Sequence, residues 1–152
     1  MNRKEQAMSN FTQGYNCAQS VALAFADLTG VQREELARLC SSFGGGMGRL
    51  REVCGAVSGM FMIAGLLYGY DQPETGEPKA EHYARIQELA RQFEAEYGTI
   101  ICRELLGSGT KRDDPTPEQR TEEYYRKRPC KEIVGHAAEL LERFIARQAA
   151  ED

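Results

Sequence analysis

Apolar residues recur at steps of three and four positions along most of the chain, which is the period of an amphipathic helix. The clearest case is residues 79–97, in which Tyr83, Ile86, Ala90, Phe93 and Tyr97 recur at three- and four-residue steps. Residues 130–148 show the same spacing. No segment alternates between apolar and polar residues for long enough to predict a strand. The pattern therefore predicts an all-α fold, a single compact bundle of about six helices.

One segment is apolar on all sides rather than on one face. Residues 53–70 contain no charged side chain and include the apolar run 60–64. A membrane-spanning helix needs about 20 predominantly apolar residues, and this segment is shorter and interrupted by glycines. We therefore expect a buried, glycine-rich helix over residues 53–68 at the centre of the bundle, and no stable membrane span. Gly55 and Gly59 would let a second helix approach it closely.

Capping residues indicate where several of these helices begin and end. Asn16 is a favourable N-cap for a helix over residues 17–27. Thr29 followed by Gln32 has the form of a capping box and predicts the start of the next helix. Gly98 predicts the end of the long helix before it.

Residues 108–127 are polar, and we expect them to form a segment within one domain rather than a linker between two domains. Thr116 and Pro117, followed by Gln119, predict the start of a short charged helix within this segment. No internal repeat or domain boundary is visible, so residues 1–152 are expected to fold as a single helical domain. The sequence assigns no function to residues 108–127.

Composition and charge bear on the partners and the compartment of the protein. The chain has 152 residues, a formal net charge of -4 and no evident basic face, so nucleic acid is not expected as a partner. The N-terminal residues are polar and no apolar run follows them, which predicts a cytoplasmic protein without a secretory signal. In that reducing compartment, five cysteines are not expected to form a structural disulfide framework. The sequence is compatible with a homodimer.

Four of the five cysteines stand where a helix is expected to begin. They are Cys17, Cys54, Cys102 and Cys130. The first turn of a helix carries unpaired N–H groups and a partial positive charge, which stabilise a thiolate and can lower the pKa of a cysteine below about 8.5. We expect Cys54, at the start of the central helix, to be the most activated thiolate, with the other three as resolving thiols or co-ligands. Cys40, near the end of its helix, is expected to be a core residue.

These four cysteines are far apart in sequence, so only tertiary packing can assemble them into one site. Zinc ribbons and Cys-x-x-Cys redox loops need short spacings and are excluded. Four converging helix starts would offer N–H donors to thiolates, to an anion or to the sulfides of an iron–sulfur cluster. An alternative hypothesis is therefore that the same four cysteines bind an iron–sulfur cluster or zinc. His82 and His136, the two histidines of the chain, are expected at the surface rather than among the ligands.

The glycine-rich loop ahead of Cys54 is the second candidate element of the site. The candidate cofactor-binding residues are Gly44, Gly45, Gly46 and Gly55. Successive N–H groups in such a loop can form a nest that binds an anion, with Arg49 and Arg51 as further anion partners. The loop matches neither a P-loop nor a dinucleotide fingerprint. A tight turn before Cys54 therefore explains these glycines equally well.

Taken in order, these motifs resemble the C-GCAxxG-C-C family of redox-active proteins. The first block is Gly14-Tyr15-Asn16-Cys17-Ala18-Gln19. The second is Phe43-Gly44-Gly45-Gly46-Met47-Gly48 followed by Cys54-Gly55-Ala56-Val57-Ser58-Gly59. The third and fourth are Cys102-Arg103-Glu104-Leu105-Leu106-Gly107 and Cys130 followed by Val134. The resemblance covers nearly the whole chain, and Cys40 falls outside the four-cysteine pattern.

The resemblance implies a redox-active protein of bacteria or archaea, encoded in some cases near transporter genes, and it implies no substrate. A cytochrome among the relatives binds haem, but this chain has no Cys-x-x-Cys-His motif, so covalent haem is not expected. Our leading hypothesis is a thiol-based redox protein that acts with a small-molecule or protein redox partner. The alternatives are a metal-binding module and a structural adaptor of a transporter.

Overall fold

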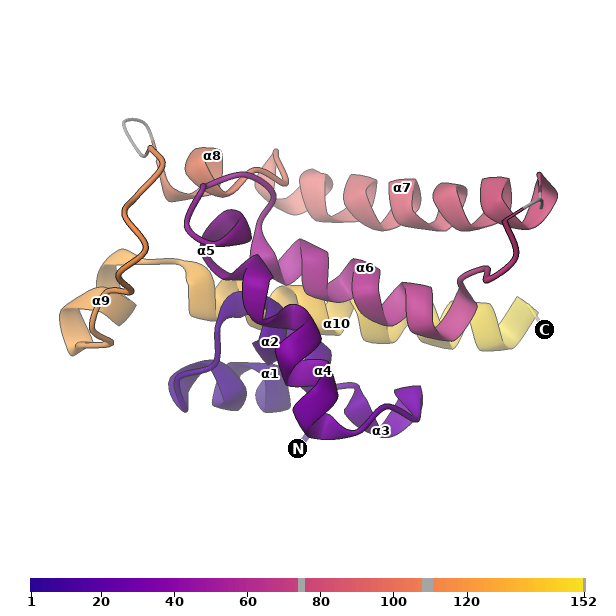
Figure 1. The fold of residues 1–152 in the computed structure, drawn as a ribbon, viewed down its shortest axis with the longest axis horizontal. Helices are drawn as coiled ribbons and strands as arrows, with labels where there is room; N and C mark the ends of the chain where they lie inside the picture. The colour runs from indigo at the N-terminus through magenta and orange to yellow at the C-terminus, as the bar shows by residue number, and fades with distance from the viewer. Residues whose placement is uncertain (74–75, 108–110, 152) are drawn as a thin grey trace.

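The computed structural model describes residues 1–73, 76–107 and 111–151, which form helices joined by loops of different lengths (Figure 1). The α-helices in these ranges are α1 (Arg3–Thr12), α2 (Cys17–Leu23), α3 (Ala26–Thr29), α4 (Arg33–Cys40), α5 (Gly44–Met47), α6 (Gly55–Tyr68), α7 (Glu77–Tyr97), α8 (Cys102–Leu106), α9 (Glu122–Lys127) and α10 (Cys130–Glu151), and a 3-10 turn, η1 (Ser41–Phe43), joins α4 to α5. The all-α prediction is confirmed. The only β feature of the described ranges is an isolated bridge between Val53 and Ile101.

The described residues contain more helices than the expected number of about six, because several are short or divided. The helix expected over residues 17–27 is divided into α2 and α3. The capping-box prediction at Thr29 is wrong, because this residue ends α3 and its Oγ1 accepts a hydrogen bond from Val31 N at 3.1 Å. Gly30, with φ of 73°, then ends the helix in the left-handed conformation.

The polar residues 108–127 also depart from the prediction. Residues 108–110 lie outside the described residues, and residues 111–121 form no helix. Helix α9 begins after Thr121, whose side chain caps it, and not after Thr116. The segment between is held instead by the contacts described in the next subsection.

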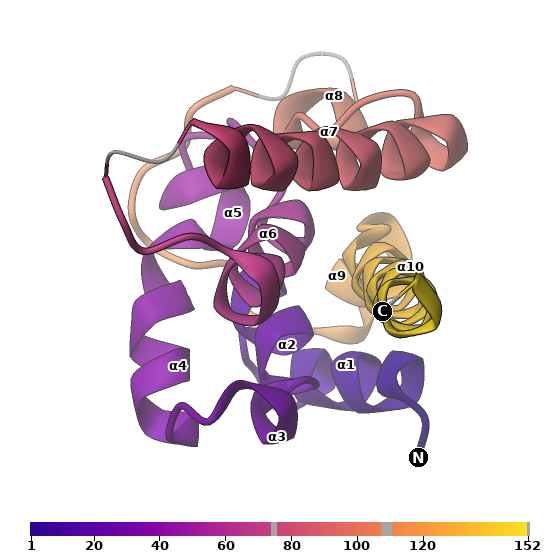
Figure 2. The same ribbon diagram turned by 90° about the vertical axis from the view of Figure 1, so that its right-hand side faces the viewer.

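The glycine-rich helix α6 lies at the centre of the described helices, as predicted. It packs against α2, α7 and α10 (Figures 1 and 2). Met60, Ile63 and Ala64 are fully buried in these contacts. A Cβ atom at Gly59 would lie 2.8 Å from Ala18 O, so the missing side chain allows α2 and α6 to pack closely. Neither α6 nor another helix of the described ranges combines the length and apolar character needed to cross a bilayer.

The two longest helices, α7 and α10, run alongside α6 (Figure 1). α10 also packs against α1, which in turn contacts α2. Gly98 ends α7 with φ of 81°, as predicted, and the chain turns from there towards α8. The starts of α6, α8 and α10 consequently lie towards the same end of the molecule, on the left in Figure 1.

Candidate functional site

The four cysteines that the sequence singles out all stand at helix starts, as predicted. Cys17, Cys102 and Cys130 are the first residues of α2, α8 and α10. Cys54 is the N-cap residue of α6. Cys40 is the last residue of α4 and is fully buried, also as predicted.

Local sequence determines the start of α2. The Asn16 side chain accepts a hydrogen bond from Gln19 N at 2.9 Å, and Gln19 Oε1 accepts one from Asn16 N at 3.1 Å. Asn16 Nδ2 also donates to Ser41 O at 3.1 Å. This second contact ties the start of α2, which carries Cys17, to the segment that leads into the glycine-rich loop.

All four of these cysteines line one cavity of about 370 Å³. Cys17 and Cys130 are half-buried, whereas Cys54 and Cys102 are only 6% and 8% exposed. All are free thiols. The cavity therefore gathers thiols from four helices that are distant in sequence, and two of these thiols are the more accessible ones.

Cys17 and Cys130 influence each other's ionisation in the cavity. A hydrogen bond from the Cys17 thiol to the Cys130 sulfur and the charges of Arg128, Arg51 and Arg120 together lower the pKa of Cys130 to about 7, against the effect of burial. The same hydrogen bond, together with burial, raises the pKa of Cys17 well above its ordinary value. The pair therefore releases its first proton near neutral pH and holds the second.

Cys54 is not the activated thiol that its helix position predicted. Burial raises the pKa of Cys54 to about 12, although its sulfur accepts hydrogen bonds from the backbone N–H groups of Ala56 and Val57, which lower it. The helix start thus acts as expected, but the desolvation of a nearly inaccessible sulfur outweighs it. Cys130 is more accessible and lies near cations, so the structure favours Cys130 rather than Cys54 as the activated thiol.

Cys102 interacts with a cation that sequence reasoning had proposed only as an anion partner. Arg51 Nη1 lies 3.8 Å from Cys102 Sγ. Burial raises the pKa of Cys102, and the hydrogen bond and charge of Arg51 oppose this rise. Arg103, the neighbour of Cys102, instead bonds Glu52 at 3.0 Å and Arg51 O at 3.1 Å.

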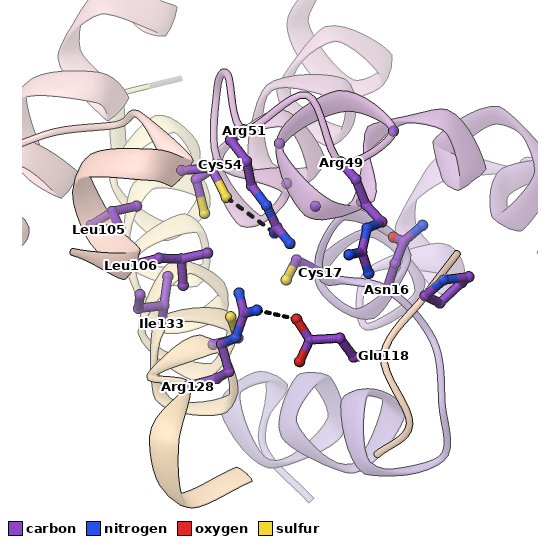
Figure 3. A pocket seen from close by; sticks show the side chains of 18 of the residues that line it. Asn16, Cys17, Arg49, Arg51, Cys54, Leu105, Leu106, Glu118, Arg128 and Ile133 are labelled. Atoms are coloured by element: carbon purple, nitrogen blue, oxygen red, sulfur yellow. Dashed lines mark hydrogen bonds and ion pairs between the residues drawn. The ribbon is translucent and has the colours of Figure 1, made fainter. Parts of the chain in front are cut away.

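The loop between α5 and α6 directs two arginines into the cavity (Figure 3). Met47, Arg49 and Arg51 have φ values of 71°, 69° and 59°. This left-handed region costs a residue other than glycine about 1–2 kcal/mol. Gly46 lies so close to its surroundings that an added Cβ would be 2.6 Å from Cys102 Cβ and 2.8 Å from Arg51 Cα. The strained loop is therefore held in place by its contact with the cysteine-bearing helix α8.

The proposed anion nest remains a prediction, but the glycines have a structural use. Gly44, Gly45, Gly46 and Gly55 all line the cavity. A Cβ at Gly44 would lie 2.5 Å from Asn16 Cβ, and one at Gly55 would lie 2.7 Å from Phe43 O and 3.0 Å from Cys17 Cβ. These positions bring the loop, α2 and α6 together closely enough to enclose the thiols.

Residues 111–120 cross the cavity and supply side chains that sequence reasoning missed. Asp113 Oδ2 accepts from Arg51 Nη2 at 2.7 Å and from Arg51 Nε at 3.1 Å. Glu118 forms an ion pair with Arg128 (Figure 3). Arg120 donates to the carbonyls of Phe11 and Tyr15 at 2.8 and 3.1 Å. Of these side chains, only Arg128 could have been found from the sequence, because it lies two positions before Cys130.

Other walls of the cavity are apolar. Leu105, Leu106 and Ile133 face it in Figure 3, and Phe11 and Tyr124 also line it. The guanidinium carbon of Arg120 lies 4.1 Å from the centre of the Phe11 ring and 5.2 Å from that of Tyr124. The cavity thus combines thiols and cations with surfaces suited to methylene groups.

The cysteines as placed do not form a metal-ligand set. Across the ranges that the structure describes, no three His, Cys, Asp or Glu side chains form a group that could hold a metal ion. The iron–sulfur and zinc alternatives gain no support from this arrangement. The expectation of a surface position is wrong for His82, which is 8% exposed and stacks edge-on against Tyr70, while His136 packs against Tyr97.

Comparison with protein families agrees with the order of the motifs. Residues 15–144 match a family model described as "Putative redox-active protein (C_GCAxxG_C_C)". This range includes the glycine-rich loop and all four helix-start cysteines. Comparison with curated proteins found no match, and comparison with solved structures found none either.

Proposed function

Because the chain belongs to the family described as "Putative redox-active protein (C_GCAxxG_C_C)", we propose that it is a thiol–disulfide redox protein in which Cys130 attacks and Cys17 resolves. The observation that carries this proposal is that the free thiols of Cys17 and Cys130 line the same cavity and influence each other's ionisation. Their interaction lowers the pKa of Cys130 to about 7 and leaves Cys17 protonated. A thiolate with a pKa near the ambient pH is the optimum attacking group in thiol–disulfide exchange.

The reaction has two steps. The Cys130 thiolate attacks one sulfur of a disulfide R–S–S–R, so that a mixed disulfide forms and R–S⁻ leaves. Cys17 then gives up its proton, and its sulfur attacks Cys130 Sγ and displaces the second R–S⁻. One of the two leaving groups takes the proton. The protein loses two electrons and gains a Cys17–Cys130 disulfide, while the substrate becomes one thiol and one thiolate.

The surrounding charges support the first step. Arg128, Arg51 and Arg120 stabilise the Cys130 thiolate before the attack. Cys54 and Cys102 have raised pKa values, so they stay protonated near neutral pH and react later than Cys130. In the cytoplasm, which is the proposed compartment, the thiol pool would return the pair to its reduced form.

Site-resolved alkylation tests the proposal. The reduced protein is treated briefly with iodoacetamide between pH 5 and 9, and the modified cysteines are identified by mass spectrometry of its peptides. Cys130 should be modified first, with a midpoint at pH about 7. Cys40, buried outside the cavity with a pKa raised to about 11, is the internal control and should stay unmodified.

Disulfide mapping tests the second step. After reaction with one equivalent of a small disulfide, the wild-type protein should contain a Cys17–Cys130 crosslink, and the Cys17→Ser variant should stop at a mixed disulfide on Cys130. The Cys40→Ser variant should behave as the wild type does. The proposal is wrong if all four cavity thiols are unreactive at neutral pH, or if the crosslink joins a different pair.

A further inference from the structure

The cavity around Cys130 carries more positive than negative side chains. Its four cationic lining residues are Arg49, Arg51, Arg120 and Arg128. Two carboxylates of the described residues pair with them: Asp113 contacts Arg49 and Arg51, and Glu118 contacts Arg128. Two positive charges are therefore left over, and an ionised Cys130 neutralises one. One positive charge remains for a bound molecule.

Arg49 has unused hydrogen-bonding capacity at this cavity. Its Nε atom is buried and has no hydrogen-bond partner in the described part of the chain. Its Nη2 lies 3.5 Å from Asp113 Oδ2, but Arg51 Nη2 lies 2.7 Å from the same oxygen and is the closer partner. A buried donor without a partner is costly, and a bound acceptor would satisfy it.

Arg120 contributes positive charge without a carboxylate partner among the described residues. Its Nη1 and Nη2 donate to the neutral carbonyls of Phe11 and Tyr15, and its guanidinium lies over the Phe11 and Tyr124 rings. These contacts hold the cation in place but leave its charge uncompensated. Arg120 enters from residues 111–121, whereas Arg49 comes from the glycine-rich loop.

We propose that the oxidant reduced at Cys130 is a small disulfide that carries negatively charged groups, which Arg49 and Arg120 attract. This proposal rests on the function proposed above and adds the class of substrate. The cavity volume of about 370 Å³ suits a small molecule. The apolar Leu105, Leu106 and Ile133 would contact the methylene groups between the charged ends and the sulfurs.

Three disulfides that differ only in their end groups test the charge preference. They are 3,3′-dithiodipropionate, which is anionic, bis(2-hydroxyethyl) disulfide, which is neutral, and cystamine, which is cationic. The rate constant for Cys130 oxidation is measured for each and divided by the rate constant for free cysteine, which removes their intrinsic reactivities. At low ionic strength the anionic disulfide should react about tenfold faster than the neutral one. Cystamine should be the slowest, and added salt should reduce the differences.

A pair of charge-matched variants separates the cavity from the net charge of the protein. Arg49→Gln should lower the anionic-to-neutral rate ratio several-fold, and Arg49→Lys should retain part of it. Arg91→Gln removes the same charge from an exposed side chain on α7 and should leave the ratio unchanged. Equal effects of Arg49→Gln and Arg91→Gln would overturn the proposal, as would equal normalised rates for the three disulfides.

A ligand that cannot be reduced distinguishes this proposal from the one on which it rests. Suberate has the chain length of 3,3′-dithiodipropionate with two methylene groups in place of the sulfurs, and 1,6-hexanediol is the corresponding neutral molecule. Suberate should slow the alkylation of Cys130 and hexanediol should not. If suberate protects but no disulfide reacts, anion binding stands and the redox function fails. If all three disulfides react equally and suberate does not protect, the redox function stands and the anionic substrate is wrong.

Discussion

Replacing Gly46 by alanine tests how tightly the glycine-rich loop packs on the cysteine-bearing helix. Gly46 has φ of 69°, and an added Cβ would lie 2.6 Å from Cys102 Cβ, 2.8 Å from Arg51 Cα and 2.8 Å from Glu52 N. Two of these three atoms belong to the backbone and cannot rotate away. Gly48 is the matched control, since its φ is 66° in the same loop and the nearest atom to its Cβ would be Ser42 O at 3.8 Å.

The two substitutions share the conformational cost and differ in the steric one. The left-handed conformation costs alanine about 1–2 kcal/mol, offset by about 0.4–1 kcal/mol because alanine restricts the unfolded chain. Gly48→Ala should therefore lower the free energy of unfolding by about 1 kcal/mol. Gly46→Ala adds an overpacking cost of about 1–3 kcal/mol, so its total should be about 2–4 kcal/mol.

Thermal and urea unfolding of both variants measures this difference. In a chain of this size, 1 kcal/mol changes Tm by about 2–4 °C, so we expect Tm to fall by about 3 °C for Gly48→Ala and about 6–12 °C for Gly46→Ala. Because the new methyl group pushes on Cys102 and Arg51, the alkylation profile of the cavity thiols should change for Gly46→Ala alone. Equal losses of stability in the two variants would refute the close packing inferred here.

Two further predictions concern α6 and the activated thiol. Gly55→Ala should lower the free energy of unfolding by about 1–3 kcal/mol, because its Cβ would meet Phe43 O at 2.7 Å. Gly65→Ala, whose Cβ would have no such neighbour within 4 Å, should instead raise the free energy of unfolding by about 0.5–1 kcal/mol through helix propensity. Urea titration measures both, and destabilisation by Gly65→Ala would contradict the prediction. Arg51→Gln should raise the pKa of Cys130 above about 7, because a cation that favours the thiolate is lost. The midpoint of Cys130 alkylation should then move to higher pH, with Arg103→Gln as the control that leaves it in place, since Arg103 pairs with Glu52 instead.

Much of the helix pattern could be predicted because the interactions that start and end a helix are local. Asn16 and Gln19 satisfy each other's backbone within one turn, and Gly98 adopts the left-handed conformation that ends α7. The errors at Thr29 and Thr116 arose where a plausible cap competed with another local partner or with longer-range contacts. Thr29 bonds Val31 N instead, and the segment after Thr116 is held by Arg120 and its neighbours.

The sequence alone determined that the chain is helical, that α6 is buried and that four cysteines stand at helix starts. These properties depend on the apolar period and on residues within about four positions of each other. Only the tertiary structure decided which thiol is ionised. Cys54 and Cys130 have equivalent positions by sequence, but burial raises the pKa of the first, while Cys17 and three arginines from separate segments lower the pKa of the second. Desolvation and Coulomb interactions act through space, and the distances that set them exist only once the chain has folded.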